Sequence, residues 1–142
     1  MKRGVTKLLG FDFGLRKIGV AVGQTLTRTA NPVTTLLARR GKPDWAAIDE
    51  LVLAWTPDAL VVGLPLNMDG TEAEPAFAAK KFSRQLGQRH KLPVFLVDER
   101  LTSLEAKREL PLKADALDVD ALAAKIILET WLSEYENAAQ RD

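Results

Sequence analysis

Cysteine is absent from this 142-residue chain, and histidine occurs once, as His90. Without cysteine the protein has no disulfide, no thiolate nucleophile and no zinc–thiolate site. A single histidine is too few for a multi-histidine metal site, and it argues against a histidine-based catalytic triad. Nineteen carboxylates remain. Because oxygen ligands suit hard cations, any metal chemistry of this chain points to Mg²⁺ or Mn²⁺.

The chain also lacks a long apolar run and a strong net charge. Residues 59–66 (ALVVGLPL) form its longest uninterrupted apolar stretch, far short of the roughly 20 residues of a membrane span. No apolar signal-peptide segment follows the N-terminal MKRGVTK. The formal net charge is only +1, so charge alone does not predict nucleic-acid binding. We expect a cytoplasmic protein without a membrane partner, with one domain over residues 1–135 and a polar tail over residues 136–142.

Two segments near the N-terminus alternate bulky and small residues. Residues 8–13 and 18–23 each carry one bulky face and one face of very small residues, and four residues separate them. This pattern predicts an antiparallel β-hairpin. Glycine on one strand face lets a helix or a ligand backbone come close to the sheet. A third strand is expected over residues 31–37, followed by a basic, glycine-containing loop over residues 38–43.

The rest of the chain alternates helix and strand patterns. We expect a helix from Asp44 to Trp55, a strand over 59–66, a helix over 74–89, a strand over 94–97, a helix from about Ser103 to Pro111, and a last helix from Asp118 or Asp120 to about Tyr135. The resulting order, β-β-β-α-β-α-β-α-α, predicts an α/β fold with a mixed five-stranded sheet and helices on both faces.

Acidic residues occur at three positions that differ from a solvated surface. Asp12 lies inside the first strand between two phenylalanines, where an unpaired carboxylate would cost several kcal/mol. Asp98 and Glu99 end a strand directly before the next predicted helix, where open α/β sheets usually bind ligands. Asp120 lies in the first turn of the last helix, on the row that faces the core.

Each of these positions also has a structural interpretation. A buried lysine or arginine could neutralise Asp12, and Asp98 and Glu99 could pair with Arg100. Asp118 or Asp120 could simply cap its helix. Taken together, however, the carboxylates could converge on one site that holds one or two divalent ions. Two such ions can stabilise the attacking and leaving oxygens of phosphodiester cleavage.

Four blocks of the sequence resemble one protein family. They are LGFDFGLRKIGVAVG, VVGLPLNMDGTE, VDERLTSLEA and VDALAAKIILETWL, which span nearly the whole chain and resemble the YqgF, or RuvX-like, family of RNase H-fold proteins related to Holliday-junction resolvases. The resemblance implies a metal-dependent endonuclease that processes the 5′ end of pre-16S rRNA during ribosome assembly. Its implied partner is structured RNA, either pre-16S rRNA or a pre-ribosomal particle. It leaves the oligomeric state open.

Two other functions remain open. A Holliday-junction resolvase-like DNase would act on branched DNA, and a non-catalytic assembly factor would bind rRNA without cutting it. Sugar kinases and actin-like ATPases share a similar glycine-rich hairpin, but they place the nucleotide between two such domains, for which 142 residues are too few.

The resemblance also implies site residues. Asp12, Glu99 and Asp120 match the family's catalytic carboxylates, which would be the metal ligands, and Asp98 stands beside Glu99 as a competitor. The family often carries a basic residue just before the last aspartate. This chain has Asp118 and Val119 there, so Asp118 is a competing ligand or cap.

Basic and amide side chains give the candidate nucleic-acid contacts. Arg16, Lys17 and Arg100 flank the proposed metal site, where phosphates would need cations. Asn67 lies in the family-like VGLPLNMDGTE stretch and could contact the nucleic-acid backbone, although it could equally serve only to form a turn. The basic cluster over residues 80–91 is more simply a solvated helix face.

Overall fold

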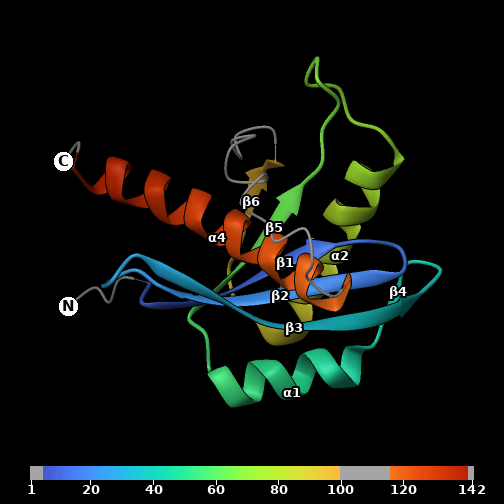
Figure 1. Ribbon diagram of the computed structural model, residues 1–142, viewed down its shortest axis with the longest axis horizontal. Coiled ribbons are helices and arrows are strands. Elements are labelled where there is room, and N and C mark those ends of the chain that lie inside the picture. Colours follow the sequence, from blue (N-terminus) through green and yellow to red (C-terminus); the bar gives the residue numbers. More distant parts are fainter. Residues whose placement is uncertain (1–4, 100–115, 141–142) are drawn as a thin grey trace.

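The computed structural model describes residues 5–99 and 116–140 (Figure 1). Its elements are β1 (Lys7–Phe13), β2 (Lys17–Gln24), β3 (Thr29–Arg39), β4 (Lys42–Pro43), α1 (Trp45–Trp55), β5 (Ala59–Leu64), α2 (Glu74–His90), β6 (Val94–Asp98) and α4 (Ala116–Gln140). The helix expected to begin near Ser103 lies outside the described residues.

The strands form a mixed sheet in the order β4-β3-β2-β1-β5-β6. The N-terminal strands β1, β2, β3 and β4 pair antiparallel in sequence order. On the other side, β1 pairs in parallel with β5, and β5 with β6. The strands β1, β5 and β6 therefore end at the same edge of the sheet.

The sheet has six strands where the sequence predicts five. The basic segment expected as a loop instead forms a tight hairpin, because β3 continues to Arg39 and the short β4 pairs back onto it. Arg40 and Gly41 make the turn with positive φ angles of 49° and 78°. Positive φ in two successive residues is the geometry of a two-residue hairpin turn.

The last helix is longer than predicted at both ends. It begins at Ala116 and continues to Gln140, whereas the sequence predicted a start at Asp118 or Asp120 and an end near Tyr135. Asp120 is therefore the fifth residue of α4 and not its cap. The residues expected as a polar tail are helical from residue 136 to residue 140.

Helices cover both faces of the sheet, as predicted. The apolar side of α4, including Ala124 and Leu128, packs on Leu8 and Ala21 on one face. On the other face, Ile48 of α1 and Phe82 of α2 pack with the bulky strand residues, and Figure 1 shows α4 and α1 on opposite sides of the strands. The predicted separation of bulky and small faces is thus confirmed. None of the described helices is both long enough and apolar enough to cross a bilayer.

The N-termini of β1 and β5 are joined through Asp58. Its Oδ2 accepts hydrogen bonds from the backbone N–H of Lys7 (2.9 Å) and of Thr6 (3.0 Å). These hydrogen bonds, of which the one from Lys7 has the largest effect, hold the pKa of the Asp58 carboxyl below its ordinary value of 3.8.

We predict that Asp58→Ala destabilises the protein by about 1 kcal/mol at neutral pH, because two hydrogen bonds to a carboxylate are lost. A carboxyl whose pKa is lowered by folding contributes stability above its unfolded pKa, and that contribution disappears as the pH falls through the folded pKa. Urea unfolding of both proteins should therefore show the difference at pH 7 and little of it near about pH 2. A difference that stays constant across this range would contradict the interpretation.

Candidate metal and nucleic-acid site

Asp12 lies on the face of the sheet that α4 covers. It shares that face of β1 with Gly10, because side chains two residues apart in a strand point the same way. A methyl group added to Gly10 would lie 2.4 Å from Cγ of Leu128 in α4. The half-buried Asp12 is therefore aimed toward α4, near the end of β1.

Asp120 reaches the same place through a backbone contact. Gly19 of β2 is the direct antiparallel partner of Asp12. A methyl group added to Gly19 would lie 1.9 Å from the carbonyl oxygen of Asp120. The backbone of α4 therefore touches the sheet at the position opposite Asp12, and only glycine there permits this approach.

Glu99 approaches from the other neighbouring strand. It directly follows β6, and a methyl group added to Gly63 of β5 would lie 2.6 Å from its Oε1 and 2.5 Å from Cδ1 of Ile127 in α4. Since Phe11 pairs with Val62, Gly63 lies beside Asp12. The Glu99 carboxylate thus lies over the strand next to Asp12, on the α4 face.

The three predicted carboxylates are therefore placed around one corner of the sheet. In the part of the chain that the structure describes, however, no three His, Cys, Asp or Glu side chains are grouped closely enough to hold a metal ion by themselves. The ligand assignment stays a prediction. The donor set of Asp12, Glu99 and Asp120 fits Mg²⁺, which proteins often bind through one or two carboxylates together with substrate phosphates.

The two competing acids are placed differently. Asp98 is the last residue of β6 and pairs with Leu64. Its neighbour Val97 packs in the core under α4, so strand alternation directs Asp98 to the opposite face, toward α2. Asp118 lies in the first turn of α4, and its side chain is outside the described part of the protein.

Of the three predicted phosphate contacts, the structure describes two. Arg16 is exposed in the turn between β1 and β2, and Lys17 begins β2. The turn is tied to the neighbouring hairpin, because the N–H of Ala38 donates to the carbonyl of Arg16 (2.8 Å). Both cations therefore sit on a supported turn that follows Asp12. Arg100 lies outside the described residues.

Asn67 closes a turn between β5 and α2. Its Nδ2 donates to Oγ1 of Thr71 (2.9 Å), and its backbone N–H donates to the carbonyl of Thr71 (2.9 Å). Oδ1 of Asp69 accepts from the N–H (2.9 Å) and the hydroxyl (2.6 Å) of the same threonine. In Figure 1 this connection extends away from the sheet. The structure thus supports the turn-forming role of Asn67, and its binding to nucleic acid stays a prediction.

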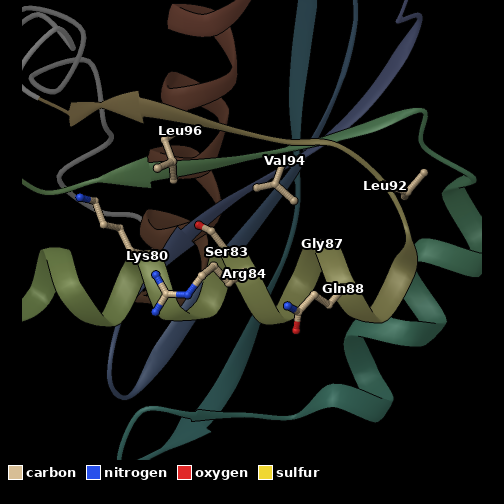
Figure 2. A pocket seen from close by; sticks show the side chains of 8 residues that line it. All are labelled: Lys80, Ser83, Arg84, Gly87, Gln88, Leu92, Val94 and Leu96. Carbon is tan, nitrogen blue, oxygen red and sulfur yellow. The ribbon is translucent and has the colours of Figure 1, made fainter.

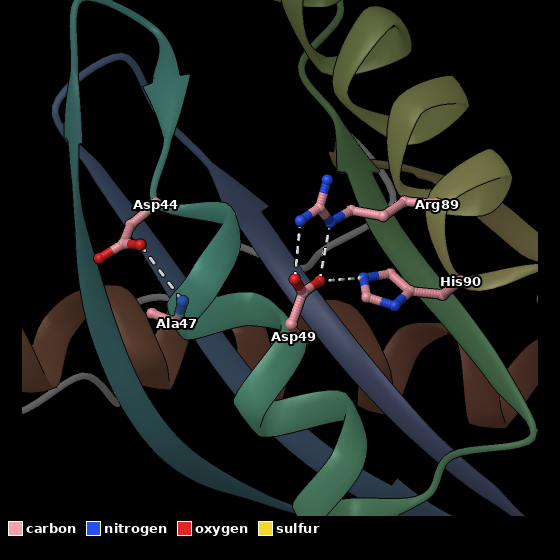
Figure 3. A network of polar contacts seen from close by, with 5 residues as sticks. All are labelled: Asp44, Ala47, Asp49, Arg89 and His90. Atoms are coloured by element: carbon pink, nitrogen blue, oxygen red, sulfur yellow. Dashed lines mark hydrogen bonds and ion pairs between the residues drawn. The ribbon is translucent and has the colours of Figure 1, made fainter.

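His90 lies on the opposite face of the sheet from this corner, at the end of α2. Figure 3 shows Arg89 donating two hydrogen bonds to Asp49 of α1, both of 2.7 Å, with His90 Nε2 3.4 Å from the same carboxylate. Burial lowers the pKa of His90, and the Arg89 guanidinium holds the pKa of Asp49 below its usual range. These residues join α1 to α2, so the histidine is not available as a base at the carboxylate corner.

Comparisons with known proteins give the family. Residues 6–134 match the family described as "RuvX: Holliday junction resolvase". A protein of Coxiella burnetii (strain RSA 331 / Henzerling II) named "Putative pre-16S rRNA nuclease" is 53% identical over 132 residues, which cover 91% of this chain and 94% of the relative. A protein of Pseudomonas putida with the same name is 50% identical over 131 residues, covering 88% and 93%.

Solved structures confirm the predicted RNase H-like fold. Thermus thermophilus RuvC in complex with a Holliday junction substrate superimposes with a TM-score of 0.55 at 16% identity, covering 91% of this chain and 96% of RuvC. The yeast mitochondrial Holliday junction resolvase Ydc2 gives 0.53 at 9% identity, covering 99% and 86%. At such identities the likeness concerns the fold alone. With a family match over most of its length and relatives about half identical to it, the chain belongs to the RuvX family.

Proposed function

We propose that this protein is a metal-dependent endonuclease that hydrolyses phosphodiester bonds of structured RNA and processes the 5′ end of pre-16S rRNA. The names of relatives that are about 50% identical support the substrate. The observation that carries the proposal is the pair of glycine contacts: Gly19 against the backbone of Asp120, and Gly63 against the carboxylate of Glu99. Both contacts lie beside Asp12.

In this proposal Asp12, Glu99 and Asp120 hold one or two Mg²⁺ or Mn²⁺ ions. When bound, the metal would supply positive charge that stabilises the attacking and leaving oxygens of phosphodiester hydrolysis. The three carboxylates are spread over β1, the end of β6 and α4, so they bind from different sides of the corner.

The cations beside this corner bind and orient the substrate. Arg16 and Lys17 follow Asp12 in the chain by only a few residues, on a turn supported by the next hairpin. We propose that they contact the phosphates next to the cut and that Arg100 and Asn67 also bind the nucleic-acid backbone. Ribosomal precursors as substrate also imply the cytoplasmic location predicted from the sequence.

The decisive assay compares RNA and DNA with the same purified full-length protein. A fragment of pre-16S rRNA that carries the 5′ leader should be cut in Mn²⁺ or Mg²⁺ and remain intact with a chelator. A four-way DNA junction in parallel reactions should be cut much more slowly. Cleavage of the junction but not of the RNA would contradict the proposal that the substrate is RNA. Tight RNA binding without cleavage in any metal would instead support a non-catalytic assembly factor.

A further inference from the structure

A cavity lies at the same end of the sheet as the three predicted carboxylates, on the opposite face. Its volume is about 510 Å³, within the range of sites for small ligands. The end of β1, the β3–β4 turn, the start of α1 and the middle of α2 enclose it. We call it the hairpin pocket. The residues that matter for the argument are Phe13, Arg40, Lys42, Trp45, Lys81 and Phe82.

Aromatic rings form one wall of the hairpin pocket. The rings of Phe13 and Phe82 stack with centroids 4.8 Å apart, and those of Trp45 and Phe82 stack at 5.7 Å. Phe82 is buried, while Phe13 and Trp45 are half-buried. The Arg89 guanidinium lies over the Trp45 ring, 5.3 Å from its centroid. The wall is therefore fixed in place, with part of its aromatic surface still open.

Cations form the rim of the hairpin pocket. Arg40, Lys42 and Lys81 are exposed. Among the residues that the structure describes, no carboxylate lines the cavity and none of these three side chains forms an ion pair. Two other cations of α2 are paired, Lys80 with Glu72 and Arg89 with Asp49. The pocket is thus locally positive although the whole chain is nearly neutral.

The hairpin pocket and the proposed active site lie at the same end of β1, on opposite faces of the sheet. Phe13 directly follows Asp12 in β1 and points to the other face of the sheet. The N–H of Gly41 in the β3–β4 turn donates to the carbonyl of Leu15 (2.9 Å), beside Arg16. A nucleic-acid strand whose cut phosphate lies at Asp12 can therefore pass over the Arg16 turn and reach the pocket.

We propose that the hairpin pocket binds an unpaired nucleotide of a single-stranded segment that flanks the cut, with its base on Phe13 and Trp45 and its phosphates at Arg40, Lys42 and Lys81. A base in a duplex is already stacked on its neighbours and cannot turn its face to a protein ring. Unpaired bases can stack on aromatic side chains while their phosphates bind cations. This inference rests on the proposed nuclease function, since it describes the path of the same substrate.

The test measures binding in the presence of a chelator, so that no RNA is cut. Two probes share one RNA duplex, and one of them carries a 5′ single-stranded tail of about ten nucleotides, within the span of one single-strand-binding domain. The double variant Lys42→Ala/Lys81→Ala should bind the tailed probe about tenfold more weakly than the wild type. For each lysine removed, the slope of log affinity against log salt concentration should also become shallower by about 0.7, the value for single-stranded nucleic acid. The tailless probe should bind both proteins alike.

Arg84→Ala provides the matched control. Arg84 is an exposed cation on α2, three residues after Lys81, but it lines a different groove of about 440 Å³ between α2 and β6 (Figure 2). Its removal changes the net charge of the same helix without touching the hairpin pocket. We expect Arg84→Ala to bind the tailed probe within about twofold of the wild type, since only general attraction is reduced.

Three results would overturn the inference: an equal loss of affinity for both probes, an equal loss in Arg84→Ala, or unchanged binding of the tailed probe by the double variant. A tail of DNA tests whether the pocket requires RNA or takes either single strand, and equal effects would assign it to single-stranded nucleic acid in general. Binding is measured without metal, so it is independent of cleavage. If the wild type cuts the RNA in Mn²⁺ and the double variant binds the tail normally, the role of the pocket is refuted and the nuclease function is not. Tail-specific binding without any cleavage would refute the nuclease function alone.

Discussion

Asp12→Asn should reduce metal-dependent cleavage of the precursor RNA by about a thousandfold or more while the protein stays folded. A thousandfold corresponds to about 4 kcal/mol of transition-state stabilisation, which is within what a bound metal contributes. Asparagine is nearly isosteric with aspartate, and it removes a negative charge from a half-buried strand position. We therefore expect the melting temperature of the variant to equal or exceed that of the wild type.

The matched comparison for Asp12→Asn is a set of equally conservative changes. Glu99→Gln and Asp120→Asn should each lower the cleavage rate by about a hundredfold or more. Asp98→Asn, which also removes a carboxylate at the end of β6 but faces α2, should keep the rate within a few-fold of the wild type. A folded Asp12→Asn protein that cuts at the full rate would show that the site lies elsewhere. A larger loss in Asp98→Asn than in Glu99→Gln would exchange these two assignments.

Gly19→Ala should destabilise the protein by about 1 to 3 kcal/mol, the usual range for overpacking a tight contact. The new methyl group would lie 1.9 Å from the carbonyl oxygen of Asp120, a backbone atom, so α4 has to move away from β2. That movement carries Asp120 away from Asp12. Cleavage should therefore fall strongly even at temperatures where the variant is fully folded, as measured by denaturant unfolding and initial rates on the same preparation.

Gly23→Ala is the control for this prediction. Gly23 lies on the same strand and the same face, but its nearest neighbours, Leu128 Cδ1 and the carbonyl oxygen of Thr29, would be 3.3 Å from the added methyl group. Both variants change the unfolded chain in the same way, since each replaces glycine with alanine. We expect Gly23→Ala to stay within about 1 kcal/mol of the wild type, with normal cleavage. Equal behaviour of the two variants would contradict a special role for the contact at Gly19.

Local patterns were sufficient to predict most of the fold. Alternation in β1 and β2 gave the correct faces because period-two burial is a property of each strand by itself. The helix predicted to start at Asp44 is present, and Oδ1 of Asp44 caps it by accepting a hydrogen bond from the N–H of Ala47 (3.2 Å; Figure 3). The mixed sheet predicted from the order of helices and strands is present, and its apolar strand β5 pairs in parallel on both sides.

The missed features depend on contacts between distant parts of the chain. The pairing of Lys42 and Pro43 with β3 requires positive φ at Arg40, which the residue type does not indicate, because only glycine adopts it without strain. The early start of α4 was missed because Asp118 and Asp120 both have the form of a cap. Helix propensity alone does not decide between a cap and an interior position.

The candidate site shows the same division. The carboxylates themselves were recognisable from the sequence, because Asp12 stands in an apolar strand and Glu99 ends another. Their meeting point was not, since it depends on how α4 crosses the sheet. Gly63 in particular lies inside the apolar strand predicted over residues 59–66, and only the structure shows that it makes room for Glu99 and Ile127. Glycines on the strand face that a helix covers are thus a sequence signal for the place where the carboxylates meet.

A crystal of the protein soaked in Mn²⁺, with its anomalous scattering measured, tests the central claim most directly. The account predicts an anomalous peak with a carboxylate oxygen of Asp12 and at least one of Glu99 and Asp120 within about 2.0 to 2.4 Å, the range of hard-cation oxygen ligands. A peak held by Asp98 on the α2 face, or no peak beside Asp12 in crystals whose protein cuts RNA in Mn²⁺, would contradict it.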